Sequence, residues 1–225
     1  MAKGRTLWEM LLDKLKGPVE LQYYNPLRAR IGSAVTLDEL EWRDLNFFVV
    51  SIQEYKRTIG PHEFRFVDYT LVARPLGGDK ILVRLRLMPV DDPNQAAGVT
   101  HHILLLRLDD DLPYDENLHK VVKDGTKKFQ VLEDNKVQAE YTRINDVIAP
   151  YGAEVTIVRD VNLDKHVTRD EIEKRRVEYW DYWREVNDEA GQPRREFLFV
   201  EMDSDNGWFQ IWKGSEIDPK RVMMY

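Results

Sequence analysis

The stretch Ile81-Leu-Val-Arg-Leu-Arg-Leu87 alternates aliphatic side chains with two arginines. Successive side chains of a β-strand point to opposite faces, so one face of this segment is apolar and the other carries Arg84 and Arg86. This alternation is typical of a half-buried strand in an antiparallel sheet. Gly77-Gly78-Asp79 precedes the segment and has the composition of a tight turn. The sequence therefore predicts a hairpin here, with both arginines on the face opposite the core.

Segments on both sides of this hairpin also have the pattern of strands. Alternating or largely apolar runs occupy residues 48–52, 64–73, 101–108 and 153–158. Three more runs, at residues 177–186, 197–202 and 208–212, are separated by short turn-rich segments. We predict that each run is a strand and that the last three form an antiparallel meander.

Three segments instead space their apolar residues as helices do. Residues 6–16 contain the capping pair Thr6 and Glu9, and Gly17-Pro18 follows as a stop signal. Residues 115–123 and 134–148 are the predicted central helices. The predicted fold class is therefore α+β, mainly antiparallel β, with sandwich- or barrel-like sheets, an N-terminal helix and one or two central helices.

A polar, turn-rich segment at residues 91–98 is the best candidate for a domain boundary. It separates an N-terminal helix and β lobe, residues 1–95, from an α+β lobe, residues 96–225, that ends in the meander. A single domain is the alternative, because a chain of 225 residues suits one large domain or two small ones.

The composition is that of a folded, soluble protein. Apolar residues make up 43% of the chain and charged residues 32%, and the formal net charge is −7. Proteins that bind nucleic acid carry a basic face, so this balance argues against nucleic acid as the main partner. The absence of cysteine excludes disulfides, cysteine-based zinc sites and thiol catalysis. No signal peptide or transmembrane segment is predicted, so we expect a cytoplasmic protein.

Three short segments resemble a known family. The segments are Ile31-Gly-Ser-Ala-Val35, Phe48-Val-Val50 and Asp68-Tyr-Thr-Leu71. Their pattern is similar to that of a bacterial domain family of unknown function, whose members are short, β-rich and sometimes encoded with membrane-stress proteins. The resemblance covers about a third of the chain and implies a β-rich fold. It implies no catalytic residues.

Residues 160–171 resemble the calcium-binding loop of an EF-hand. Its first, third, fifth and last positions are the oxygen ligands Asp160, Asn162, Asp164 and Glu171. The loop departs from that pattern at Lys165, where a glycine is needed for the sharp turn. Thr168 and Glu171 also have the spacing of a capping box, so a polar loop entering a short helix is the alternative.

A run of acidic residues follows the predicted strand at 101–108. It consists of Asp109, Asp110, Asp111, Asp115 and Glu116. Carboxylates at a strand end are candidates for a carboxylate- or metal-dependent hydrolase, provided that a second group is held at a fixed distance. The alternative is a solvated loop in which Asp115 caps the following helix.

The meander carries an unusual set of aromatic residues. The members that we predict to form a binding surface are Tyr179, Trp180, Tyr182, Trp183, Trp208 and Trp212. The alternation places aromatic rings on both faces of the sheet. One face can pack on the core, and the other needs cover from this chain, from another protein or from a ligand.

The function predicted from these observations is that of a non-enzymatic binding or scaffold protein that acts through protein contacts or self-association. No G-x-S-x-G nucleophile motif and no phosphate-binding loop is present. The alternatives are a hydrolase that uses the acidic run and a binding protein stabilised by calcium. Apart from that calcium, no cofactor is expected.

Overall fold

The computed structural model describes residues 25–39, 41–59, 62–89, 101–123, 127–134, 136–144, 151–158, 172–188 and 190–225. Its strands are β1 (Ala34–Leu37), β2 (Asn46–Ile59), β3 (His62–Ala73), β4 (Ile81–Pro89), β5 (His101–Pro113), β6 (Lys128–Glu133), β7 (Lys136–Arg143), β8 (Tyr151–Val158), β9 (Ile172–Asn187), β10 (Pro193–Asp203), β11 (Trp208–Ile217) and β12 (Val222–Met224). Helix α2 spans Glu116–Lys123, and a 3-10 turn, Pro219–Arg221, precedes β12.

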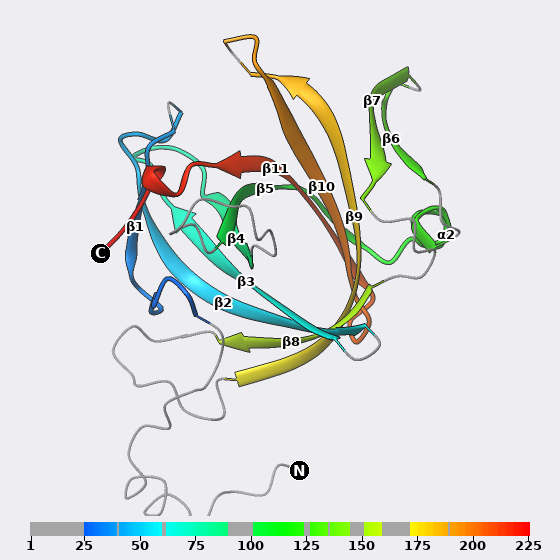
Figure 1. The fold of residues 1–225 in the computed structure, drawn as a ribbon, viewed down its shortest axis with the longest axis horizontal. Coiled ribbons are helices and arrows are strands. Elements are labelled where there is room, and N and C mark those ends of the chain that lie inside the picture. The colour runs from blue at the N-terminus through cyan, green and yellow to red at the C-terminus, as the bar shows by residue number, and fades with distance from the viewer. Residues whose placement is uncertain are drawn as a thin grey trace, which may run out of the picture.

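Eight of these strands close into an antiparallel barrel. The order around the ring is β2-β3-β4-β5-β11-β10-β9-β8, and β8 pairs with β2 to complete it (Figure 1). The other strands extend this ring. β1 and β12 continue the sheet from one end of β2, and the β6-β7 hairpin joins β9 through Thr142 and Arg143. Closure pairs every strand of the ring on both sides, so the barrel has no exposed sheet edge within it.

The predicted α+β fold class is wrong, because the described part of the chain is nearly all β and contains one α-helix, α2. The predicted helix at 115–123 is confirmed as α2, and the side chain of Asp115 caps it by accepting a bond from the Leu118 amide at 2.7 Å. Within the predicted helix at 134–148, residues 136–143 instead form the strand β7, and residues 135 and 145–148 lie outside the described residues. The predicted N-terminal helix at 6–16 lies outside the described residues.

The misassigned segment shows why helical spacing misled the prediction. In β7, Ala139, Tyr141 and Arg143 point inward, and Tyr141 is fully buried opposite Phe129 of β6. Val137, which completed the helical pattern, is 54% exposed. Strand pairing and burial of the Tyr141 ring therefore outweigh a weak local preference.

The remaining strand predictions are confirmed. The last three runs form the meander β9-β10-β11, in which neighbouring strands pair antiparallel. The turn between β10 and β11 contains Gly207 at a φ of +60°, a conformation that glycine adopts without strain. The strands β4 and β5, which flank residues 91–98 along the chain, pair with each other from Val83 to Pro89. The division at residues 91–98 stays a prediction.

Two apolar clusters cover the outside of the barrel. Residues 25–39 (which include β1), residues 41–45 and β12 pack on β2–β5 and bury Val83, Leu85 and Leu87 of β4. Helix α2 and the β6-β7 hairpin pack on β9–β11 (Figure 1). Each large apolar side chain buried in this way contributes roughly 1.5–3 kcal/mol.

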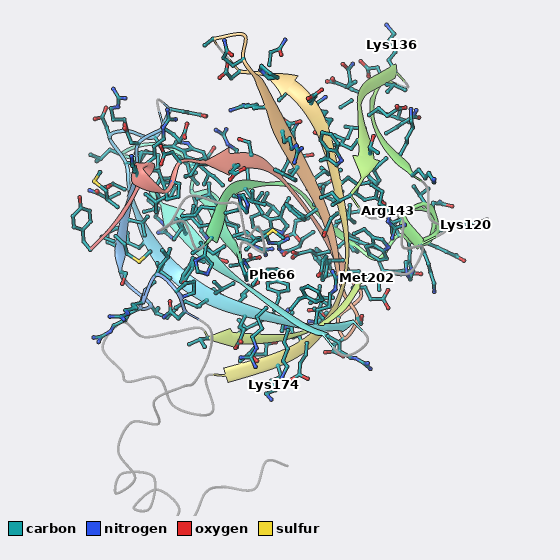
Figure 2. All side chains as sticks on the ribbon, viewed as in Figure 1. Phe66, Lys120, Lys136, Arg143, Lys174 and Met202 are labelled. Atoms are coloured by element: carbon teal, nitrogen blue, oxygen red, sulfur yellow. The ribbon has the colours of Figure 1, made fainter. Side chains whose placement is uncertain are left out.

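The same alternation fills the inside of the barrel with side chains. Figure 2 shows Phe66 inside the ring, whereas Lys120 on α2 and Lys136 on β7 project away from it. On β4 the aliphatic residues share one face, as the alternation predicted. That face points outward onto the first apolar cluster, and the opposite face is the barrel interior rather than solvent. Arg84 and Arg86 are consequently 2% and 1% exposed. Among the described residues, no helix is long and apolar enough to cross a membrane.

Candidate functional site

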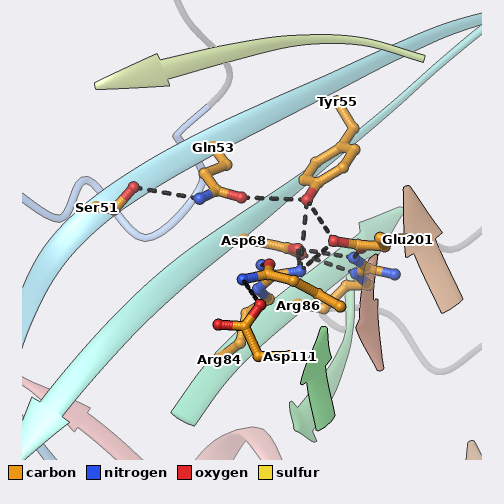
Figure 3. Close-up of polar contacts among 9 residues, drawn as sticks. Ser51, Gln53, Tyr55, Asp68, Arg84, Arg86, Asp111 and Glu201 are labelled. Atoms are coloured by element: carbon orange, nitrogen blue, oxygen red, sulfur yellow. Dashed lines mark hydrogen bonds and ion pairs between the residues drawn. The ribbon is translucent and has the colours of Figure 1, made fainter. Parts of the chain in front are cut away.

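A cluster of four charged residues lies at the centre of the barrel. Arg86 of β4 binds Asp68 of β3 through two bonds, Nε to Oδ1 at 2.8 Å and Nη2 to Oδ2 at 2.7 Å. Arg84 donates from Nη1 to Glu201 Oε2 of β10 at 2.7 Å and lies 3.1 Å from Asp68 Oδ2. Arg86 Nη2 also contacts Glu201 Oε1. We call these four residues the ion quartet (Figure 3).

The ion quartet is electrically balanced, because two guanidinium groups face two carboxylates. Burial would raise the pKa of Glu201, but Arg84 and Arg86 outweigh burial and lower it well below the usual range. Glu201 therefore stays ionised and bound on both oxygens. Such a carboxylate is a poor general acid or base, since its pKa lies far below neutral pH.

Aromatic rings surround the two arginines. The Arg84 guanidinium lies 3.8 Å from the ring centre of Trp212, and that of Arg86 lies 4.4 Å from Phe199 and 4.7 Å from Phe66. Cation–π contacts of this kind are strongest where water is excluded. The rings therefore offset part of the cost of burying the two cations.

The ion quartet lies between two cavities in the barrel interior. Arg84 and Glu201 line the first cavity, and Arg86 lines the second. The first has a volume of about 520 Å³. Its wall combines five aliphatic side chains (Val50, Leu82, Val155, Ile157 and Val177) with amides, hydroxyls, ion pairs and two tryptophans; because the amides and ion pairs lie here, we call it the polar cavity. The second has a volume of about 810 Å³ and is lined by many aromatic side chains; we call it the aromatic cavity. Both volumes are in the range of small-molecule sites.

Hydrogen bonds connect the polar cavity to the ion quartet. Gln53 Nε2 lies 3.4 Å from Ser51 Oγ, and Tyr55 Oη lies 3.1 Å from Gln53 Oε1 and 3.2 Å from Glu201 Oε2 (Figure 3). Burial raises the pKa of Tyr55 well above its ordinary value, so its hydroxyl keeps its proton and donates to one of these oxygens at a time. On the other side of the cavity, Gln210 lies between Arg84 and Asp111.

The aromatic cavity combines an apolar wall with guanidinium groups. Its apolar lining includes Phe64, Phe66, Met88, Leu104, Phe197 and Phe199. Four arginines also line it, against two carboxylates: the arginines are Arg57, Arg65, Arg86 and Arg195, and the carboxylates are Asp181 and Glu216. Arg65 and Arg195 are exposed, so two of the guanidinium groups lie where the cavity meets solvent.

Asp181 of β9 is the most perturbed acid in this cavity. Burial raises its pKa to about 6, against the opposing effect of Arg86 and Arg57. Its Oδ1 is buried and has no hydrogen-bond partner within the described residues. A buried carboxylate oxygen without a hydrogen-bond partner is unfavourable and often marks a functional position.

The six predicted aromatic residues do not form one surface. Trp180 and Tyr182 are fully buried on the outside of the barrel, beneath α2 and the β6-β7 hairpin. Tyr179 and Trp212 are buried and line the aromatic and polar cavities respectively. This chain itself therefore covers four of the six rings.

The other two aromatic residues are partly accessible. Trp183 is half-buried next to Arg195, whose guanidinium lies 5.0 Å from a ring centre of Trp183. Trp208 lines the polar cavity, is 41% exposed and donates from its indole nitrogen to Asp111. The predicted protein contact through this set stays a prediction.

The acidic run does not form a catalytic cluster. All five side chains are exposed: Asp109, Asp110, Asp111, Asp115 and Glu116. Asp115 caps α2, and Asp111 accepts bonds from Trp208 and Gln210. Hydrolysis by paired carboxylates needs two of them facing one substrate, and this arrangement is not seen among these five.

No group of three histidine, aspartate or glutamate side chains in the described part of the chain could hold a metal ion. The predicted calcium ligands Asp160, Asn162, Asp164 and Glu171 lie outside the described residues. The calcium site therefore stays a prediction.

Sequence reasoning missed the ion quartet. Asp68 and Glu201 each have apolar or aromatic neighbours on both sides in the sequence, and Arg84 and Arg86 stand among leucines and Val83. The signal that could have predicted it was that both acidic and basic residues occur within otherwise apolar strands. Buried charges occur in compensating pairs, so such residues are candidates for a buried ion pair. The alternation alone could not show that their face was enclosed.

Comparison with known proteins gives no relative of this chain. No family model matches it, and neither the curated proteins nor the solved structures include a significant match. The resemblance noted for residues 31–71 stays an interpretation of the sequence.

Proposed function

We propose that this protein is a non-enzymatic binding protein that holds a small amphipathic anion, such as a medium-chain fatty acid, in the aromatic cavity. The observation that carries the proposal is a cavity of about 810 Å³ with an aromatic wall and exposed guanidinium groups. The sequence predicted binding through protein contacts at the meander surface; this proposal instead places a small ligand in the barrel interior.

The wall of the cavity supports an apolar ligand body. Phe66, Phe197 and Phe199 come from β3 and β10, and Met88 and Leu104 add flexible and aliphatic surface from β4 and β5. Apolar ligands are stabilised by roughly 25 cal/mol for each Å² of apolar surface that leaves water. Methionine adapts its shape to ligands of different outline.

The arginines support an anionic head group. Arg195 lies on β10 and Arg65 on β3, and both are exposed at the edge of the cavity. A guanidinium presents a planar fork of donors that matches a carboxylate. Arg65 lies 3.3 Å from Glu54, and Arg86 is bound by Asp68 and Glu201, so the head group is expected mainly at Arg195. The anionic group is therefore expected at the mouth and the apolar chain deeper inside.

The fixed charges of the interior support binding rather than catalysis. Both carboxylates of the ion quartet are bound by arginines, and the acidic run is exposed outside the barrel. Of the two carboxylates that line the aromatic cavity, Glu216 is bound by His102 at 2.5 Å, and Asp181 has a pKa raised to about 6 by burial. A single such group without a second catalytic partner is insufficient for the acid–base pairs that hydrolases use.

Titration calorimetry with laurate tests the proposal. Wild-type protein is expected to bind laurate, and Arg195→Glu is expected to weaken binding by about tenfold or more through charge reversal. Arg194→Glu is the matched control, because Arg194 is exposed on the same strand but points to the opposite face. Dodecanol and dodecyltrimethylammonium test the need for the negative charge. Absence of laurate binding, or equal loss in both variants, would refute the proposal.

A further inference from the structure

We infer that the polar cavity is a second ligand site, which binds an uncharged, polyhydroxylated molecule of the size of a mono- or disaccharide. This inference does not depend on the aromatic cavity, because the ion quartet lies between the two. It rests on three properties of the polar cavity: paired charges, loosely bonded amides and an accessible tryptophan.

The charged groups of the polar cavity are paired within its own wall. Arg84 binds Glu201 at 2.7 Å, and Arg175 binds Asp203 at 2.6 Å. Four of the lining residues carry charge, and these two pairs include all four. A charged ligand would have to compete with an existing partner, whereas a neutral ligand leaves both pairs intact.

Long hydrogen bonds hold the amide nitrogen of Gln53 and both polar atoms of the Gln210 amide, whereas Gln53 Oε1 accepts a bond of 3.1 Å from Tyr55 Oη. Gln53 Nε2 lies 3.4 Å from Ser51 Oγ. Gln210 Oε1 lies 3.4 Å from Arg84 Nη2, and its Nε2 lies 3.5 Å from Asp111 Oδ1. Well-formed bonds of this kind measure about 2.7–3.2 Å. Each amide is both a donor and an acceptor, so a ligand hydroxyl can replace a long bond with a shorter one.

Trp208 gives the site an aromatic surface next to solvent. It lines the polar cavity and is 41% exposed, and its indole nitrogen is fixed by Asp111. The face of an indole carries negative charge density. It therefore attracts the weakly positive C–H groups on the apolar face of a sugar ring, while the hydroxyls at the ring edge remain free for Gln53 and Gln210.

Saturation-transfer NMR and tryptophan fluorescence, with glucose and maltose as probes, test the inference. Wild-type protein is expected to show transfer to at least one of these sugars. Gln53→Leu and Gln210→Leu are each expected to weaken binding about tenfold, because each removes the amide with little change in volume. Gln138→Leu, an exposed position on β7, is the matched control and should bind as the wild type does.

Two comparisons make the outcome decisive. Glucuronate has the ring of glucose with a carboxylate, and it is expected to bind more weakly than glucose. Trp208→Leu changes an exposed side chain, so loss of sugar binding with an unchanged melting temperature supports the site. Laurate binding should be unaffected in Gln53→Leu, which separates this inference from the proposed function. Absence of transfer to both sugars, tighter binding of glucuronate, or equal affinity in all glutamine variants would overturn it.

Discussion

Glu201 Oε2 lies 2.7 Å from Arg84 Nη1, although 117 residues separate the two along the chain. β10 and β4 are not neighbours in the barrel, so this contact crosses the interior. Interior ion pairs are more sensitive to the loss of one partner than surface pairs are, since the remaining charge stays buried. The ion quartet therefore ties opposite sides of the barrel together.

Glu201→Gln is expected to destabilise the protein by about 3–5 kcal/mol, because one carboxylate would then face two buried guanidinium groups. The measurement is the free energy of unfolding in urea at neutral pH. Glu185→Gln on β9 is the control, since Glu185 is exposed. A loss below about 1 kcal/mol, the value typical of exposed pairs, would contradict the buried position of the ion quartet.

Asp181 is expected to make stability depend on pH in a particular direction. Burial raises its folded pKa from 3.8 to about 6, so the folded state holds the proton more tightly than the unfolded state. Stability from this group is therefore greatest below pH 4 and falls as the pH rises through 4 to 6. Above pH 6 the folded state carries the full cost of ionising this buried carboxyl, of the order of 2–3 kcal/mol.

Asp181→Asn removes this ionisation and keeps the shape. The difference in unfolding free energy between the variant and the wild type is expected to grow in favour of the variant between pH 4 and pH 6, and then to stay constant. Using this difference cancels the titration of acids shared by both proteins. A difference that does not change with pH would show that Asp181 has an ordinary pKa.

Asp115→Ala is expected to cost about 1 kcal/mol, because the Leu118 amide loses its cap at 2.7 Å. Since α2 covers Trp180, loosening of this helix should also shift tryptophan emission to longer wavelength. Lys120→Ala changes an exposed residue of the same helix and should leave both readouts near the wild type (Figure 2). Equal behaviour of the two variants would rule out the cap.

The sequence predicted individual strands better than their arrangement. The alternation in Ile81–Leu87 correctly identified β4 and the side on which Val83 and Leu85 pack. It could not show that the side of Arg84 and Arg86 is enclosed, because an arginine pattern is the same whether it faces solvent or a barrel interior. Enclosure depends on β8 pairing with β2 and on β5 pairing with β11, which are contacts between distant segments.

The site was harder to predict for the same reason. Asp68, Arg84 and Glu201 come from three strands, and nothing along the chain connected the two acids with the arginine pair of β4. The aromatic residues of the meander were conspicuous, but their faces were assigned without knowledge of α2 and β7 above Trp180. Local pattern identifies which side chains share a face, and only the closed fold determines what that face contacts.

Closure of the barrel at β5 and β11 gives a final prediction. A Cβ atom added at Gly214 would lie 1.9 Å from the backbone oxygen of Leu105 and 2.9 Å from the Cα of Leu106. Backbone cannot rotate away as a side chain can, so Gly214→Ala should force the two strands apart and cost about 3 kcal/mol. Gly152→Ala on β8 is the matched control, because nothing lies within 4 Å of its added Cβ. Urea unfolding measures both variants, and hydrogen exchange should show faster exchange along β5 and β11 in Gly214→Ala alone. Equal stability of the two variants would mean that β5 and β11 do not approach as closely as the barrel requires.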